Sequence, residues 1–103
     1  MLILVGDFEN PKLEIEIEND LLLIIKGHIN YGLLPASLKI LSELDVFKIT
    51  ELTPEDNRTI MLALLTTDLV EGIEEDLSFI LLELKKAFTR AVDESLLVYG
   101  VGD

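Results

Sequence analysis

The chain lacks cysteine and tryptophan altogether and has one histidine, His28, among its 103 residues. Without cysteine there are no disulfides, no thiolate catalysis and no cysteine-ligated zinc or iron–sulfur sites. A single histidine gives little basis for a histidine-rich zinc site or for a serine–histidine–aspartate triad. The glycine spacing contains neither the dinucleotide-binding nor the P-loop motif. We therefore expect no catalytic residues, metal or cofactor, and we expect that the protein is not an enzyme.

Basic residues are also scarce, since eight lysines and arginines stand against twenty acidic residues, for a formal charge of −12. A field of that sign repels phosphate backbones and anionic lipid surfaces, so we expect neither nucleic-acid nor membrane binding. The expected partner is a basic protein or peptide. The alternative is that the charge only keeps an apolar domain dispersed in water.

Long hydrophobic runs are missing. The longest, at residues 21–25 and 60–65, are far shorter than the ~20 residues of a membrane-spanning helix. The apolar residues 1–5 carry no basic flank and end at Gly6, so they do not resemble a signal peptide. These features predict a cytoplasmic protein.

Aliphatic residues are abundant. Half of the chain is hydrophobic although aromatic residues make up only 6%. A chain of this length buries about 65% of its surface on folding, enough for a core without disulfides. We expect one compact domain over residues 1–103, with an aliphatic core.

Four segments of the chain have the pattern of strands. Residues 12–18 alternate between charged and apolar side chains, which is the period of a half-buried strand. Asn19-Asp20 fits a two-residue hairpin loop, with residues 21–29 as the returning strand. Residues 1–5 and 96–99 predict an N-terminal and a C-terminal strand.

Helix signals follow from Pro35 onward. Pro35 suits the first turn of a helix that runs to about residue 44. Thr53 and Pro54 are typical of a helix start and predict a helix over 54–70, although 58–66 also fit a strand. Residues 46–52 fit either a strand or a connector, and a third helix is expected from about residue 74 to 94. The predicted fold class is α+β: an antiparallel sheet of three or four strands with two or three helices packed against it.

One candidate surface lies on the predicted hairpin. Glu14, Glu16 and Glu18 share one face of the 12–18 strand, and the returning strand is apolar on both faces near the turn. Any register then places apolar side chains beside the glutamates. Either further elements cover both faces of the sheet, or the face is acidic and partly apolar and suits a basic, amphipathic partner.

A second candidate surface lies on the third helix. Phe79 and Leu82 fall outside its apolar stripe, on the side that carries charged residues. They are either ordinary exposed side chains or the contacts of a helix-mediated dimer. Together these surfaces predict a small acidic protein-interaction module of the adaptor, regulator or inhibitor type. We expect it to form a homodimer and to recognise a basic protein.

The segment between Gly27 and Gly32 supports a different function. It gathers His28, Asn30 and Tyr31 in a predicted loop, and loops carry binding residues more often than cores do. The alternative function is therefore small-molecule or cation binding at this segment. The plainer interpretation is that these side chains pack and hydrogen-bond at the end of a strand.

Overall fold

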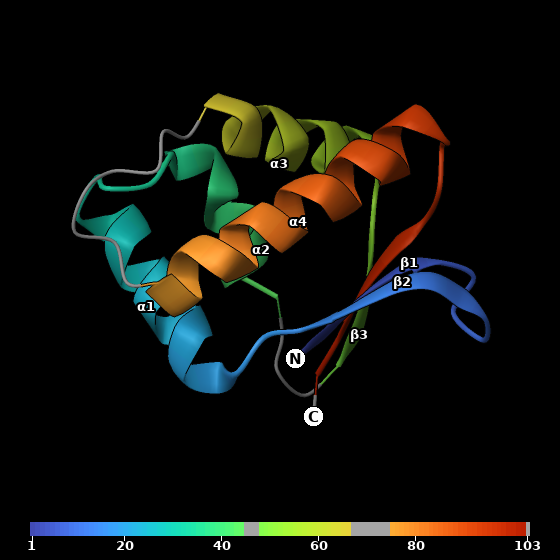
Figure 1. Cartoon of the computed structure of the whole chain (residues 1–103), viewed down its shortest axis with the longest axis horizontal. Helices are drawn as coiled ribbons and strands as arrows, with labels where there is room; N and C mark the ends of the chain where they lie inside the picture. The colour runs from blue at the N-terminus through green and yellow to red at the C-terminus, as the bar shows by residue number, and fades with distance from the viewer. Residues whose placement is uncertain (45–47, 67–74, 103) are drawn as a thin grey trace.

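A computed structural model describes residues 1–44, 48–66 and 75–102. The predicted α+β class is confirmed: four antiparallel strands form one sheet, and four α-helices, rather than two or three, pack against it (Figure 1). In chain order the elements are β1 (Leu2–Gly6), β2 (Pro11–Glu16), α1 (Asn19–Asn30), the 3₁₀-helix η1 (Ala36–Leu38), α2 (Lys39–Ser42), β3 (Ile49–Leu52), α3 (Pro54–Thr66), α4 (Glu75–Asp93) and β4 (Val98–Val101).

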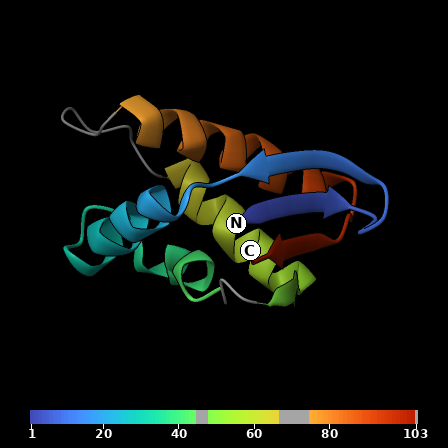
Figure 2. The same ribbon diagram turned by 90° about the horizontal axis from the view of Figure 1, so that it is seen from below.

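The sheet has the strand order β2-β1-β4-β3, with every neighbouring pair antiparallel. The only hairpin in it joins β1 to β2, and β4 returns from the end of the chain to lie between β1 and β3. The helices all lie on one side of the sheet, and in Figure 2 β1 and β4 are seen in front of α3. The sheet therefore has one face covered by helices and one face over which no helix of the described residues lies.

The predicted hairpin between residues 12–18 and 21–29 is wrong, because residues 21–29 belong to helix α1. An uninterrupted aliphatic run has no period of its own, so it fits a buried helix as well as a two-sided strand. Leucine is a good helix former, and Asp20 lies in the first turn, where the helix dipole favours an acid. Ile25 and Ile29, one helical turn apart, are the buried residues of this helix. The pairing partner of β2 is β1, through the turn at residues 7–10.

A substitution at Gly27 tests this correction. Gly27 lies inside α1, and a Cβ atom added to it would meet nothing within 4 Å. Alanine is therefore expected to stabilise the protein by about 0.5–1 kcal/mol, because glycine is the poorer helix former. Urea unfolding of the wild type and of Gly27→Ala measures this difference in the free energy of unfolding. If residues 21–29 formed a strand, alanine would not increase the stability. An unchanged or lowered urea midpoint of unfolding would therefore contradict the helix.

The other helix predictions are largely confirmed. Pro35 directly precedes η1 and α2, which together form a shorter helical segment than expected. Thr53 caps α3: its Oγ1 accepts a hydrogen bond from the Asp56 N–H at 3.0 Å, and Asp56 Oδ2 accepts one from the Thr53 N–H at 3.3 Å. Residues 58–66 are helical, and residues 49–52 form a strand. Parts of the predictions at 46–47, 67–70 and 74 lie outside the described residues.

The C-terminal strand begins two residues later than expected, at Val98 instead of Leu96. The difference arises at the end of α4, where Ser95 adopts a left-handed conformation with φ 53°. The Leu96 N–H then donates to the Ala91 carbonyl at 2.8 Å, a helix-ending bond typical of this conformation. Residues 95–97 therefore form the turn between α4 and β4 instead of the start of the strand.

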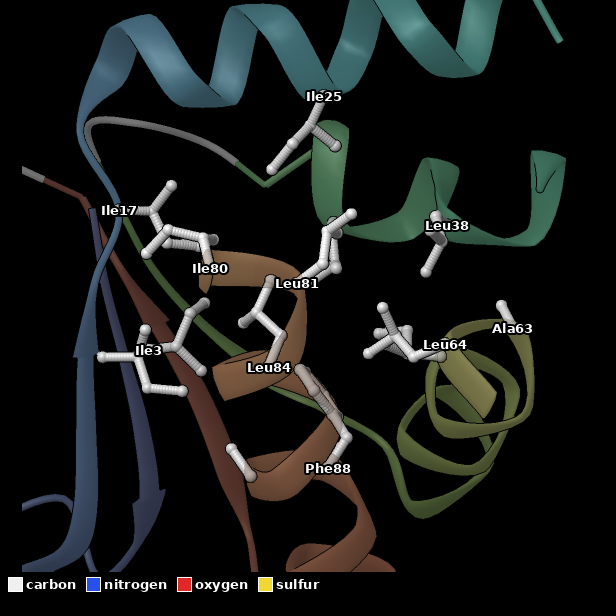
Figure 3. Close-up of a cluster of buried hydrophobic side chains, with 14 of the residues drawn as sticks. Ile3, Ile17, Ile25, Leu38, Ala63, Leu64, Ile80, Leu81, Leu84 and Phe88 are labelled. Carbon is white, nitrogen blue, oxygen red and sulfur yellow. The ribbon is translucent and has the colours of Figure 1, made fainter. Parts of the chain in front are cut away.

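The core lies between the covered face of the sheet and the helices. Ile3 on β1 points toward Ile80 and Leu84 on α4, and Phe88 lies between the sheet and Leu64 of α3 (Figure 3). Every one of these side chains is buried. Within the described ranges the core is aliphatic apart from Met1 and Phe88, in agreement with the composition. Because α4 packs against β1 and β2, its remaining side is directed away from the sheet.

Candidate functional site

The uncovered side of the sheet, which we call the open face, follows from the alternation of side chains along the strands. Ile3 and Val5 of β1 are fully buried on the helix side, so Leu2 and Leu4 point the other way. The pairing register then shows which residues of the neighbouring strands lie on the same face as Leu2 and Leu4. The open face consists of Leu2, Leu4, Glu14, Glu16, Ile49, Glu51, Tyr99 and Val101.

Two rows of paired residues cross the open face. One row runs Glu16, Leu2, Val101, Ile49, and the other runs Glu14, Leu4, Tyr99, Glu51. Neighbouring strands lie about 4.8 Å apart, so Glu14 and Glu51 stand about 14 Å apart at opposite edges of the sheet. An apolar strip therefore runs along the two central strands, with carboxylates at both edges. None of the eight residues is basic.

Aromatic side chains extend this strip toward the β1–β2 turn. Phe8 packs edge-on against Tyr99, with 5.5 Å between ring centroids and an interplanar angle of 74°. The pKa of the Tyr99 hydroxyl is raised, first by loss of hydration and then by the negative charges of Glu51 and Asp7. The field at the open face is thus negative and favours positive charge.

The three predicted glutamates are only partly brought together. Glu14 and Glu16 lie side by side on the open face, as their alternation predicted, and both are exposed. Glu18 is also exposed, but it follows the end of β2 as the N-cap residue of α1 and belongs to no strand pair. The structure adds Glu51 from β3, whose place next to Tyr99 arises from pairing between segments far apart in the sequence.

Phe79 and Leu82 are exposed on α4, at 62% and 43% of their surface. They do not adjoin Glu14 and Glu16, because α4 covers the opposite side of the sheet and its exposed side is directed away from it. The molecule therefore has two separate candidate surfaces.

The surface around Leu82 is hollowed. A groove of about 460 Å³ runs along the exposed side of α4 beside Leu65 at the end of α3. Three basic residues in the C-terminal half of this helix, Lys85, Lys86 and Arg90, were not included in a site by the sequence analysis. The α4 groove is lined by Leu65, Leu82, Lys85, Lys86, Thr89, Arg90, Asp93 and Glu94.

Cations in the α4 groove are held by ion pairs within the helix. Lys86 Nζ lies 3.7 Å from Glu83 Oε1, and Arg90 Nε donates to Glu94 Oε2 at 2.7 Å. Glu94 also lies 3.6 Å from Lys12 Nζ, and the hydrogen bond from Arg90 lowers the pKa of the Glu94 carboxyl. Such exposed pairs are screened by solvent and contribute little to stability. They can therefore be exchanged for contacts with a partner at low cost.

The segment from Gly27 to Gly32 is not the predicted loop. Residues 27–30 form the last turn of α1, and the His28 imidazole Nδ1 lies 2.9 Å from the Ile24 carbonyl oxygen within that helix. Asn30 and Tyr31 are exposed at its end, Tyr31 to 86%. No group of three or more histidine, aspartate or glutamate side chains in the described ranges has the geometry to hold a metal ion.

A smaller cavity of about 170 Å³ lies between the start of α3 and the Ser95 turn. Asn57, which lines it, is 97% buried, and its Oδ1 has no hydrogen-bond partner. A polar cavity of this size has room for hydrogen-bonding water molecules, which commonly satisfy such groups. Sequence reasoning did not identify Asn57, since a single asparagine on a helix carries no signal of burial.

Within the parts of the chain that the structure describes, no helix has the length and apolar character needed to cross a bilayer. Comparison of the chain with protein-family models, with curated proteins and with solved structures finds no match.

Proposed function

We propose that this protein is a small, acidic, non-enzymatic interaction module of the adaptor, regulator or inhibitor type, which recognises a basic protein partner through its open face. The observation that carries the proposal is the arrangement of that face. Half-buried Leu2, Tyr99 and Val101 surround the buried Leu4 in an apolar strip, with carboxylates at both edges and no helix of the described residues over it. Burial of the strip favours binding, and the carboxylates select the charge of the partner.

The spacing of the carboxylates favours a helical partner. An α-helix is about 10 Å wide and fits between two acidic edges about 14 Å apart. Its apolar stripe would lie on the central strands, with lysine or arginine on both flanks near Glu14, Glu16 and Glu51. A second sheet of the same kind suits this face poorly, since stacking two copies face to face would bring carboxylates close to carboxylates.

A synthetic helix tests the proposal. The probe is a fluorescein-labelled 18-residue peptide with leucine along one helical face and lysine on both flanks, here called the basic helical peptide. We expect a dissociation constant in the micromolar range by fluorescence anisotropy, and about tenfold weaker binding at 0.5 M than at 0.1 M NaCl, because salt screens exposed charges.

The matched control peptide carries glutamate in place of every lysine. It keeps the leucine face but is repelled by the acidic edges, so no binding is expected up to the highest concentration tested. Equal binding of the two peptides, or affinity that does not change with salt, would contradict recognition of a basic partner.

The alternative function, binding of a small molecule or cation by His28, Asn30 and Tyr31, stays a prediction. The feature that favours it is the exposure of Asn30 and Tyr31 at the end of α1. Replacing His28 and Tyr31 with alanine would abolish such binding and leave the affinity for the basic helical peptide unchanged.

A further inference from the structure

We infer that a second copy of this chain is itself a partner of the open face, with the α4 groove of one copy docked on the open face of another. The inference rests on the proposed function, because it uses the same acidic open face. It also specifies the basic, helical partner of that face. The α4 groove supplies both properties. It presents one side of a helix, and three of the eight basic residues of the chain line it.

Charge and shape in the α4 groove complement the open face. Leu82 and Leu65 give it an apolar centre. At about 100° per residue, Lys85 lies about 60° to one side of Leu82 and Lys86 about 40° to the other. Cations thus flank an apolar centre on both sides, and the open face has carboxylates on both sides of an apolar strip.

Two acidic residues, Asp93 and Glu94, close the C-terminal end of the α4 groove. Glu94 already contacts Arg90 and Lys12, so its charge is largely compensated. The complementary region is therefore the part of the groove around Leu82, Lys85 and Lys86. Lys86 pairs with Glu83, about one turn away, and its side chain is 65% exposed.

The position of the two surfaces determines the form of the assembly. The open face lies on one side of the sheet, and α4 lies on the other side with its exposed surface directed outward. The contact joins two different surfaces, so each added copy leaves one open face and one α4 groove free. Such a contact produces open stacks that grow with concentration, whereas a two-fold contact stops at the dimer.

Two charge-reversal variants test the inference in sedimentation-velocity experiments. Glu14→Lys/Glu16→Lys removes the acidic surface, and Lys85→Glu/Lys86→Glu removes the basic one. The measurements use 0.15 M NaCl, where a Debye length of about 8 Å screens the repulsion between whole molecules of charge −12. Circular dichroism verifies that both variants fold.

The wild type is expected to exceed the mass of a dimer as its concentration rises toward the order of 1 mM, and each variant alone is expected to stay a monomer of 11.5 kDa. An equimolar mixture of the two variants retains one intact open face and one intact groove. The other two surfaces, with lysines on one variant and glutamates on the other, also attract each other, so the mixture is expected to associate again although each variant alone does not.

Three results would overturn the inference: a wild type that stays monomeric, a variant that associates as strongly as the wild type, or a mixture that stays monomeric. The second is the outcome for a two-fold interface or for an unrelated contact, because at least one variant keeps such a contact intact. The proposed function is tested separately, because Lys85→Glu/Lys86→Glu keeps its open face. If that variant binds the basic helical peptide while the wild type never associates, the inference fails and the proposed function stands.

Discussion

Replacing Glu14 and Glu16 with lysine is expected to weaken binding of the basic helical peptide by about thirtyfold to a hundredfold. Each substitution turns an attraction at the edge of the open face into a repulsion, which costs about 1 kcal/mol or slightly more per site in exposed surroundings. Since 1.4 kcal/mol corresponds to a tenfold change in affinity, the two changes together give the stated range. The titration is the same anisotropy experiment, performed at 0.1 M NaCl.

A matched variant separates local charge from net charge. Glu43→Lys/Glu55→Lys also changes the formal charge from −12 to −8, but both residues are exposed on helical segments away from the open face. This variant is expected to bind the peptide within about threefold of the wild type, because distant exposed charges are screened. An equal loss of affinity in both variants would show that the overall charge, rather than the open face, attracts the peptide.

Truncating Phe88 to alanine is expected to lower the free energy of unfolding by about 3–5 kcal/mol. Phe88 is fully buried between α4, α3 and the sheet, and it is the only aromatic side chain among the core residues that the structure describes. Its removal leaves a cavity that the surrounding aliphatic residues fill only in part. Since domains of this size are stable by about 5–15 kcal/mol, the variant is expected to be only marginally folded.

Urea unfolding followed by circular dichroism measures the effect. The control is Phe79→Ala, which removes the same side chain from the exposed side of the same helix and is expected to change the stability by less than about 0.5 kcal/mol. A large loss for Phe79→Ala, or a small one for Phe88→Ala, would contradict the orientation of α4.

The orientation of α4 and the alternation of β2 are the parts of the fold that follow most directly from the sequence. Leu13, Ile15 and Ile17 alternate with glutamates at the period of a strand, and only that structure sorts them onto two faces. Along α4, buried residues such as Leu77, Leu81 and Leu84 recur at helical spacing. The exposure of Phe79 and Leu82 followed from the same pattern.

The prediction of a strand at residues 21–29 was wrong for a physical reason. Five consecutive aliphatic residues give no information on which side is buried, so helix and strand are equally compatible with them. The choice is made by tertiary contacts: α1 packs against α2 and η1, and Ile25 enters the common core. Those contacts are not visible in a local pattern.

The composition of the open face was predicted only in part, for a related reason. The face of β2 that carries Glu14 and Glu16 was recognised, but its true neighbours are Leu2 and Leu4 of β1. The remainder of the face comes from pairing of β4 with β1 and β3, which joins segments at opposite ends of the chain. Strand order depends on these distant pairings, and no turn motif in the sequence specifies them.

The most direct test of the account is to map the binding surface by NMR, with the basic helical peptide added to ¹⁵N-labelled protein. We expect the largest amide shift changes in the strands at Leu2, Leu4, Glu14 and Tyr99, with little change along α1 and α2. Changes concentrated on the helices, with the strands unaffected, would show that the open face is not where a basic partner binds.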